Sequence, residues 1–350
     1  MKRTPSTLIA SLAALAIAGA ASFADAPVNL IKNGSAEDAT GNVIAGWSWT
    51  PGSITPEQGV GGVSNDAFEG KNSFRIAMTQ PVGANVWFVQ GFSLPPTTKS
   101  FQVIFSAKQK TDAARTQWAV PGVGCYFNDK AGQWMYYQYL RNVDPSDKWT
   151  TFTNTVNVPI GATSVGLRLA VGSQGVIEAL FDDIRVYPSD SYANSLINAD
   201  IEDGTLAWVV KRTACNDKQA VADVAKDGAD GKQSLHLGST DTLNPVHVSW
   251  SQMVQTTGGI TSYDISIKGK VVDGAGANHP DATVGYAFLN EKRREIGYMP
   301  FGVLTGKTWA PYTTKVAVPP DTQFIEVRLC LDGTGLTDAY FDSIKIVPAK

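Results

Sequence analysis

The sequence predicts an all-β protein built from two tandem β-sandwich domains of the jelly-roll type. The 350-residue chain contains 33 glycines and 18 prolines, with many threonines and valines, a composition that favours short strands joined by turns. Apolar and polar residues alternate with a period of two over residues 101–107 and 263–267, as in half-buried strands. The second half of the chain also repeats the first, which indicates a duplicated domain.

The N-terminal residues have the layout of a secretory signal peptide. A basic start, Met1 to Arg3, precedes an apolar run over residues 8–20, and small residues follow it up to Ala24 and Ala26. The apolar run is shorter than the about 20 residues that a membrane span needs. We expect residues 1–24 to be a signal peptide and the mature protein to be secreted, either extracellular, at the cell surface or in the periplasm, without membrane insertion.

The duplication defines two modules. Trp149 and Trp309 begin one pair of matching stretches, and Asp182 and Asp342 lie in another pair at the same offset. This offset is much longer than the about 20–50 residues of a solenoid repeat, so whole domains are duplicated. We predict a first module over residues 27–188 and a second over residues 194–350, joined by a short polar linker.

Charge and composition argue against several kinds of partner. The net charge is −3, and the sequence contains no cluster of lysine or arginine residues. Nucleic acids and anionic membrane surfaces are therefore not expected partners, because both are bound through concentrated positive charge.

A set of short motifs occurs in order along the first module and largely again along the second. In the first module it comprises residues 29–37, 46–47, 70–73, 149–150, 167–169 and 181–184. This ordered set resembles the carbohydrate-binding modules of families 4, 9, 16 and 22, which accompany cellulases and xylanases. The resemblance implies a galactose-binding-like β-jelly roll in each half. The second module departs from it at Ala199 and Ser343, where the first has Gly34 and Asp183.

The resemblance also implies one structural calcium ion in each module. In these families calcium commonly ties the first strand to the last, and calcium prefers carboxylate and carbonyl oxygens. The matching acids are Glu37 and Asp182 in the first module, and Glu202 and Asp342 in the second. The alternative is that these acids are polar residues at strand ends.

The sequence contains three cysteines, an odd number, so at least one thiol has no partner within the chain. Some relatives of these families join an early strand to the penultimate one, which would pair Cys215 with Cys330. We interpret Cys125 as a small buried hydrophobic residue.

Sugars present apolar C–H faces and polar rims, so their sites combine aromatic rings with amide and guanidinium groups. We expect Trp134, Tyr136 and Gln138 to share one face of a strand and Met135, Tyr137 and Tyr139 the other, with one of the two faces exposed. The first-module candidates for carbohydrate binding are Trp47, Trp87, Trp118, Trp134, Tyr136, Gln138 and Arg168. Xylan-binding relatives place a sugar-stacking tryptophan where Trp87 lies.

The second-module candidates are fewer: Trp208, Trp250, Tyr298 and Arg328. Trp208 and its counterpart in the first module, Trp47, could equally serve in packing. Trp250 lies one residue closer to its following glutamine than Trp87 does, a spacing that would turn it to the opposite face. The recurring Trp149 and Trp309 are expected in the cores.

The resulting hypothesis is a secreted, non-catalytic protein that recognises a plant or microbial polysaccharide through aromatic-lined grooves, with the first module the better candidate. It would work with a partner enzyme or in a cell-surface assembly. The alternative is a structural cell-surface or matrix protein that uses the same fold for protein contacts. A polysaccharide lyase or glycoside hydrolase is less favoured, because no carboxylate pair of the kind a glycosidase needs is evident and the three histidines lack metal-ligand spacing.

Overall fold

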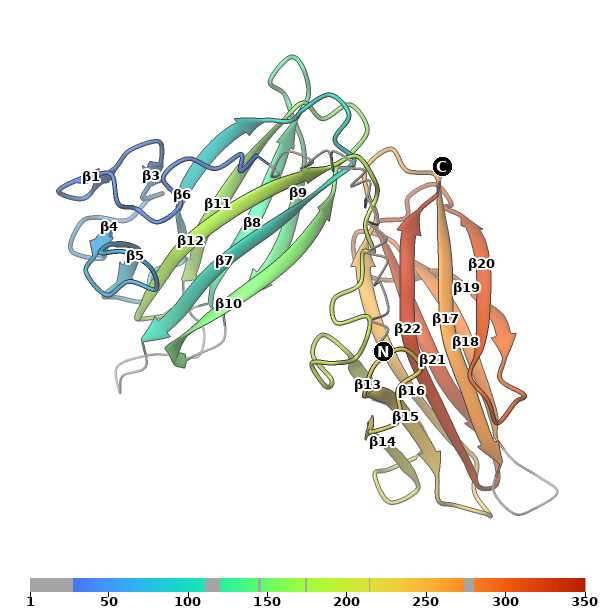
Figure 1. Cartoon of the computed structure of the whole chain (residues 1–350). Helices are drawn as coiled ribbons and strands as arrows, with labels where there is room; N and C mark the ends of the chain where they lie inside the picture. Colours follow the sequence, from blue (N-terminus) through green and yellow to red (C-terminus); the bar gives the residue numbers. More distant parts are fainter. Residues whose placement is uncertain are drawn as a thin grey trace, which may run out of the picture.

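The computed structural model describes residues 28–110, 120–143, 146–173, 175–213, 215–273 and 280–349. These residues form strands, turns and loops, and they contain no helix, so none that could span a membrane. Figure 1 shows two β-sandwiches, one formed by the blue-to-green half of the chain and one by the yellow-to-red half. The predicted fold class, two tandem β-sandwiches, is confirmed. The predicted signal peptide lies outside the described residues.

The first sandwich consists of two five-stranded sheets. The sheet that we call the β7 sheet has the order β10 (Ser146–Asn157), β7 (Ser100–Lys110), β12 (Ile177–Ser189), β5 (Ser73–Met78) and β4 (Gly59–Ser64). The β11 sheet has the order β3 (Ser48–Thr50), β6 (Ala84–Ser93), β11 (Ser164–Ser173), β8 (Val120–Asn128) and β9 (Trp134–Asn142). A small ribbon of β1 (Ala39–Thr40) and β2 (Val43–Ile44) precedes them.

The second sandwich repeats this arrangement strand for strand. Its β17 sheet has the order β14 (Ala220–Ala225), β15 (Ser234–Ser239), β22 (Thr337–Pro348), β17 (Ser262–Asp273) and β20 (Ala310–Ala317). Its β21 sheet has the order β13 (Val209–Arg212), β16 (Val246–Gln255), β21 (Phe324–Gly333), β18 (Asp281–Leu289) and β19 (Glu295–Val303). The paired strands in these sheets are antiparallel, and the identical order is the structural counterpart of the sequence duplication.

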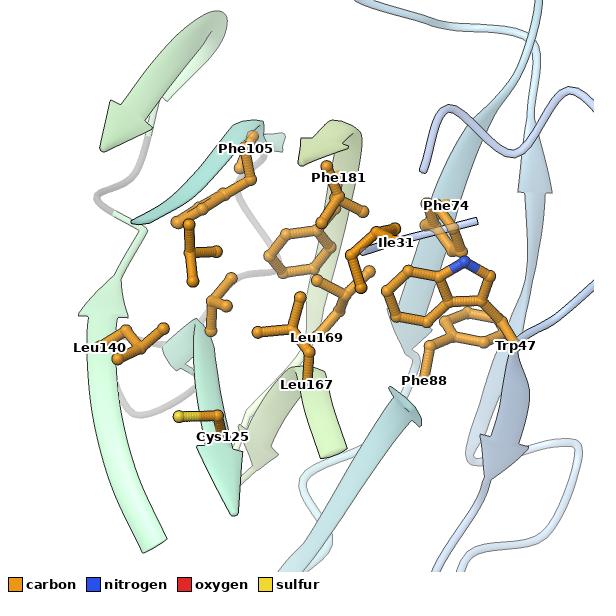
Figure 2. Packing of buried hydrophobic residues seen from close by; sticks show 14 of the residues in the cluster. Ile31, Trp47, Phe74, Phe88, Phe105, Cys125, Leu140, Leu167, Leu169 and Phe181 are labelled. Carbon is orange, nitrogen blue, oxygen red and sulfur yellow. The ribbon is translucent and has the colours of Figure 1, made fainter. Parts of the chain in front are cut away.

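The core of the first module lies between its two sheets. Alternate residues of the β11 sheet, such as Leu167 and Leu169, meet Phe105 and Phe181 of the β7 sheet, and all four are fully buried (Figure 2). Burying such a side chain contributes about 1.5–3 kcal/mol relative to leaving it exposed. The residues between these inward positions on the β11 sheet therefore point out of the sandwich, and they decide what the module can bind.

Direct hydrogen bonds join the first module to the linker and to the second module. Asn157 at the end of β10 bonds both backbone groups of Ala193, with its Nδ2 donating to the carbonyl at 3.1 Å and its Oδ1 accepting from the N–H at 2.8 Å. The N–H of Ile160 donates to the carbonyl of Gly258 at 3.0 Å. The polar segment between the sandwiches is thus tied to the first module.

Candidate functional site

The outer face of the β11 sheet carries a concentration of aromatic side chains around one arginine. Strand pairing brings these residues together from four strands, in cross-strand rows two residues apart. We call this surface the aromatic face and define it by Trp87, Tyr126, Trp134, Tyr137, Tyr139 and Arg168. It unites three of the residues predicted for carbohydrate binding, Trp87, Trp134 and Arg168. Tyr137 and Tyr139 lie on the strand predicted to carry an exposed aromatic face.

The rows show how the face is assembled. Arg168 in β11 lies opposite Val89 of β6 on one side and Gly124 of β8 on the other, and Gly124 in turn lies opposite Tyr139. In the next row, Gly166 of β11 lies opposite Tyr126 of β8, and Tyr126 lies opposite Tyr137 of β9. Such pairs, with side chains on one side of the sheet, are close enough for aromatic residues to interact across strands.

Glycines in the central strands allow the tyrosine rings to lie against the sheet. A Cβ atom added to Gly166 would come within 3.0 Å of the Tyr126 ring, and one added to Gly124 would lie 2.8 Å from Cζ of Tyr137. The rings therefore occupy the space where a side chain of the neighbouring strand would stand. The Tyr139 hydroxyl lies over Gly122 in the same way, so three tyrosines cover the glycine positions of this face.

Arg168 lies among these rings. Its guanidinium carbon is 4.6 Å from the ring centroids of both Trp87 and Tyr126 and 5.8 Å from that of Tyr137. Cation–π contacts of this kind contribute about 0.5–2 kcal/mol each, depending on exposure. The Nε atom of Arg168 is buried and has no hydrogen-bond partner among the described residues. The rings thus fix the position of the arginine without satisfying its hydrogen-bond donors.

The rim of the aromatic face is open to solvent. Trp134 is 65% exposed and Tyr139 is 49% exposed. Burial is the main cause, and the neighbouring Tyr137 a smaller one, that raises the pKa of the Tyr139 hydroxyl to about 12. Burial also raises the pKa of Tyr137. Both hydroxyls therefore stay protonated at neutral pH. The Tyr139 hydroxyl donates to Oδ1 of Asn142, which leaves its oxygen as an acceptor, whereas the Tyr137 hydroxyl can donate as well as accept a hydrogen bond.

The grouping predicted for β9 is confirmed for Tyr137 and Tyr139, which share the outer face, and for Tyr136 and Gln138, which share the inner one, but it is wrong for Trp134. The carbohydrate-binding role predicted for Tyr136 and Gln138 does not fit their inward direction. Trp134 lies on the outer face, whereas Tyr136 turns inward, 6.1 Å from the core residue Phe127, and donates from its hydroxyl to the carbonyl of Thr256 in the second module at 2.9 Å. The reason is an irregularity in the β8–β9 register beside Phe127, which inserts one residue and reverses the alternation. The inward-turned Gln138 lines a cleft of about 510 Å³ between the modules instead.

Three further tryptophans predicted for sugar binding lie in the cores. Trp47, Trp208 and Trp250 are 6%, 5% and 3% exposed. Each indole N–H donates to a backbone carbonyl, and Trp47 packs edge-on against Phe74 at 4.7 Å (Figure 2). Their role is therefore packing, and the opposite orientation inferred for Trp250 from its spacing agrees with its core position. Trp118 lies outside the described residues.

Trp149 and Trp309, which we expected in the cores, are half-buried instead. The ammonium group of Lys108 lies 5.1 Å from the Trp149 ring, and that of Lys270 lies 4.9 Å from the Trp309 ring. The repeated tryptophan thus forms the same lysine contact in both modules, outside the sandwich cores.

The corresponding face of the second module carries ion pairs in place of most of the rings. Ser249 pairs with Cys330 where Trp87 pairs with Ala170 in the first module, so this tryptophan has no counterpart. Of the two candidates that lie here, Tyr298 has its ring centroid 5.3 Å from the guanidinium carbon of Arg328. The face is accordingly charged rather than aromatic.

The acids predicted to bind calcium hold a loop in each module. In the first module, Oδ2 of Asp182 accepts from the backbone N–H groups of Phe68 and the next residue at 2.7 and 3.0 Å. Glu37 Oε1 accepts from the N–H groups of Lys71 and the next residue at 2.7 and 2.8 Å. Asp182 thus fastens this loop to the last strand, β12, and Glu37 fastens it to the segment that precedes β1.

The second module repeats these bonds. Asp342 Oδ2 accepts from the backbone N–H groups of Ala229 and the next residue at 2.6 and 3.2 Å. Glu202 Oε1 accepts from those of Lys232 and the next residue at 2.6 and 3.1 Å. Burial raises the pKa of both Asp182 and Asp342, although these N–H donors act in the opposite direction.

The four acids lie where the resemblance implies calcium, and each accepts backbone N–H bonds. Calcium takes about six to eight oxygen ligands, which include backbone carbonyls as well as carboxylates. Within the described ranges no group of three His, Cys, Asp or Glu side chains is placed to hold a metal ion. A carboxylate in this arrangement is satisfied without a cation.

The predicted disulfide between Cys215 and Cys330 is wrong, because both thiols are free. Cys330 is buried on β21 opposite Thr283, whereas the Sγ atom of Cys215 donates to the carbonyl of His247 at 3.3 Å. Cys125 is also free and fully buried in the core, as predicted.

No family model matches the chain, and no curated protein matches it. Among solved structures, the tandem pair of CBM22 modules from Paenibacillus barcinonensis Xyn10C is 16% identical with a TM-score of 0.34, over 94% of this chain and 100% of that one. The structure described as family 16 carbohydrate-binding module 2 is 18% identical with a TM-score of 0.31, over 44% of this chain and 99% of that one. These are carbohydrate-binding modules, the class that the sequence motifs resemble. With every such score below 0.5, they support no inference about the ligand.

Tyr126 is the member of the aromatic face that the sequence did not single out. Its signal was indirect: Gly122 and Gly124 alternate with core positions in its own strand, and Gly166 does so in the next. Three glycines on one face of two adjacent strands indicate that large side chains from neighbouring positions lie across them.

Proposed function

We propose that this protein binds a polysaccharide through the aromatic face of its first module. The observation that carries the proposal is the grouping of Tyr126, Tyr137 and Tyr139 over glycines, beside Arg168 and the exposed Trp134. The exposed rings of Trp134 and Tyr139 can contact the apolar C–H face of a sugar. The phenol and guanidinium groups at their edges are donors for the hydroxyl rim.

We also propose that the chain is exported and acts without catalysis, beside a partner enzyme or in a cell-surface assembly. Export rests on the N-terminal pattern in the sequence. The non-catalytic role is supported by the composition of the aromatic face, whose four cross-strand rows contain no Asp or Glu in the described strands. A glycosidase of the common type needs two such carboxylates beside the bound sugar.

Affinity electrophoresis tests the proposal. The mature protein is run through gels that contain cellulose derivatives, xylan, β-glucan, mannan, pectin or alginate. Retardation in at least one gel, lost in a Trp87→Ala/Trp134→Ala double variant, is the expected result. A Trp309→Ala variant is the control, because this half-buried ring lies in the second module, directly before β20.

Free migration of the unchanged protein through every gel would contradict the proposal. In that case the structural alternative, a surface or matrix protein that uses its sandwiches for protein contacts, would be tested by sedimentation for self-assembly.

The two structural calcium ions are proposed on the resemblance alone. Thermal unfolding in calcium chloride and in excess chelator tests them. A higher melting temperature in calcium that is lost in Glu37→Gln and Glu202→Gln variants supports bound calcium, since a ligand that binds only the folded state stabilises it. Equal melting temperatures mean that the acids act only as loop fasteners.

A further inference from the structure

Each module has an arginine at the same position of equivalent strands, Arg168 in β11 and Arg328 in β21, but the two arginines differ in their charged neighbours. Arg328 in β21 is ion-paired with Glu326 at 2.6 Å and with Glu295 at 2.7 Å. Glu326 is also bonded to Lys211. Arg328 thus lies in a network in which two carboxylates offset two cations.

Arg168 has no such compensation. Its neighbours on the aromatic face are aromatic, aliphatic or glycine residues, and no ion pair involves it in the described part of the chain. At the position two residues before it, where the second module has Glu326, the first module has Gly166. The replacement removes the carboxylate and makes room for the ring of Tyr126.

A half-buried guanidinium without a carboxylate partner is an incomplete arrangement. Ring contacts attract the cation but leave its charge and its N–H donors in place, and Nε of Arg168 is cut off from solvent with no hydrogen-bond partner among the described residues. The strongest partner for a guanidinium is a carboxylate, which can accept two parallel N–H bonds. Neutral hydroxyl groups would satisfy the donors but not the charge.

We infer that the ligand of the aromatic face is an acidic polysaccharide, with the carboxylate of a uronic acid residue on Arg168 and neighbouring sugar rings on the tyrosines. This inference rests on the proposed function and specifies its substrate class. The overall charge of −3 opposes nonspecific attraction to polyanions, so binding of such a polymer would have to come from a local site.

Two polymers that differ only in charge give the sharpest test. Polygalacturonate and the same polymer with its carboxyl groups methyl-esterified are compared in affinity gels, and alginate is compared with its propylene glycol ester. We expect the free acids to bind about tenfold more tightly than the esters, because a hydrogen bond to a charged group contributes about 1.5–3 kcal/mol. Higher salt should narrow the difference.

Substitutions assign the preference to one residue. An Arg168→Gln variant should bind acid and ester equally, whereas Arg168→Lys, which keeps the charge without the fork of donors, should retain part of the preference. Arg75→Gln is the matched control: it removes one positive charge from the same module, but Arg75 lies on β5 of the other sheet and pairs with Glu178. Its preference should equal that of the unchanged protein.

Each other outcome is informative. Equal binding of acid and ester by the unchanged protein, or binding of neutral polymers only, would overturn the acidic class while leaving the aromatic face as a glycan site. An acid preference that survives in Arg168→Gln would overturn the role of this arginine. A lack of binding to every polymer, including the neutral panel, would instead remove the proposed function itself.

Discussion

Substitution of Gly166 by alanine should weaken glycan binding while changing the stability of the fold only slightly. Gly166 lies in the central strand of the β11 sheet, opposite Tyr126 on one side and Gly91 on the other. A Cβ atom at this position would approach Cζ, Cε1 and the hydroxyl oxygen of Tyr126 to under 3.0 Å, so the ring must lift off the sheet. The three nearest atoms all belong to this one side chain, which can rotate, so the strand itself need not move.

Two opposing contributions make the expected change in stability small. Replacing glycine by alanine inside a strand stabilises by about 0.5–1 kcal/mol through the backbone entropy of the unfolded chain. Displacing Tyr126 loses its cation–π contact with Arg168, now at 4.6 Å, which contributes about 0.5–2 kcal/mol. The net effect lies between about 0.5 kcal/mol stabilising and about 1.5 kcal/mol destabilising, which is at most roughly 3–6 °C in melting temperature for a domain of this size.

Binding should change much more than stability. The displaced ring no longer covers position 166, and Arg168 loses one of the rings that hold it in place. We expect about tenfold weaker glycan binding, which corresponds to a loss of about 1.4 kcal/mol of binding free energy. Migration in the gel that retards the unchanged protein, together with thermal unfolding, measures both quantities.

Gly91→Ala is the matched control. Gly91 is the neighbour of Gly166 in the same cross-strand row, but the nearest atom to its added Cβ is the carbonyl oxygen of Val165 at 4.0 Å, an ordinary contact. This variant should bind as the unchanged protein does. Undiminished binding by Gly166→Ala would refute the reasoning, because it would mean that the ring over this glycine takes no part in the site.

Three further results are expected. Trp47→Ala should destabilise the first module by about 3–5 kcal/mol, as for other buried aromatic residues, whereas Trp134→Ala should change its unfolding free energy by less than about 0.5 kcal/mol and weaken glycan binding; a reversed order in calorimetry would contradict their placement. Of the three cysteines, only Cys215 should react quickly with a thiol reagent in the native protein, and all three should react after unfolding without reductant; a single reactive thiol in the unfolded chain would demonstrate a disulfide. Burial tends to raise the pKa of Glu326, but its bonds to two cations hold the pKa below the ordinary value of 4.5. The ionised carboxylate therefore stabilises the folded state above that pH, and this stabilisation is lost as the pH falls through the lowered pKa. Glu326→Gln should reduce the loss of unfolding free energy at acid pH, and an unchanged pH dependence would show that Glu326 does not contribute to it.

Residue patterns alone were sufficient to predict the sandwiches and their duplication. The alternation at Leu167, Arg168 and Leu169 assigns two side chains to the core and one to the surface, and the structure has them in those places. Side-chain direction in a strand depends on position parity, which can be read from the sequence wherever a strand is regular.

Tertiary structure decided which aromatic residues are available. In β9, one inserted residue reverses the parity, so Tyr136 faces the core and Trp134 the solvent, contrary to the alternation in the sequence. The choice between packing and binding for Trp47 and Trp208 depended on the neighbours that surround each ring, and those neighbours come from distant strands.

The charge of the site was also a tertiary matter. The sequence places Arg168 and Arg328 at equivalent positions. Only the strand register shows that Arg328 has two glutamates beside it, whereas Arg168 has aromatic rings. The sequence by itself therefore determined the fold class, the duplication and the outward direction of both arginines, because these depend on local periodicity. The structure alone decided which rings form a surface and which cation lacks a counter-ion, because both depend on contacts between strands that are far apart in the chain.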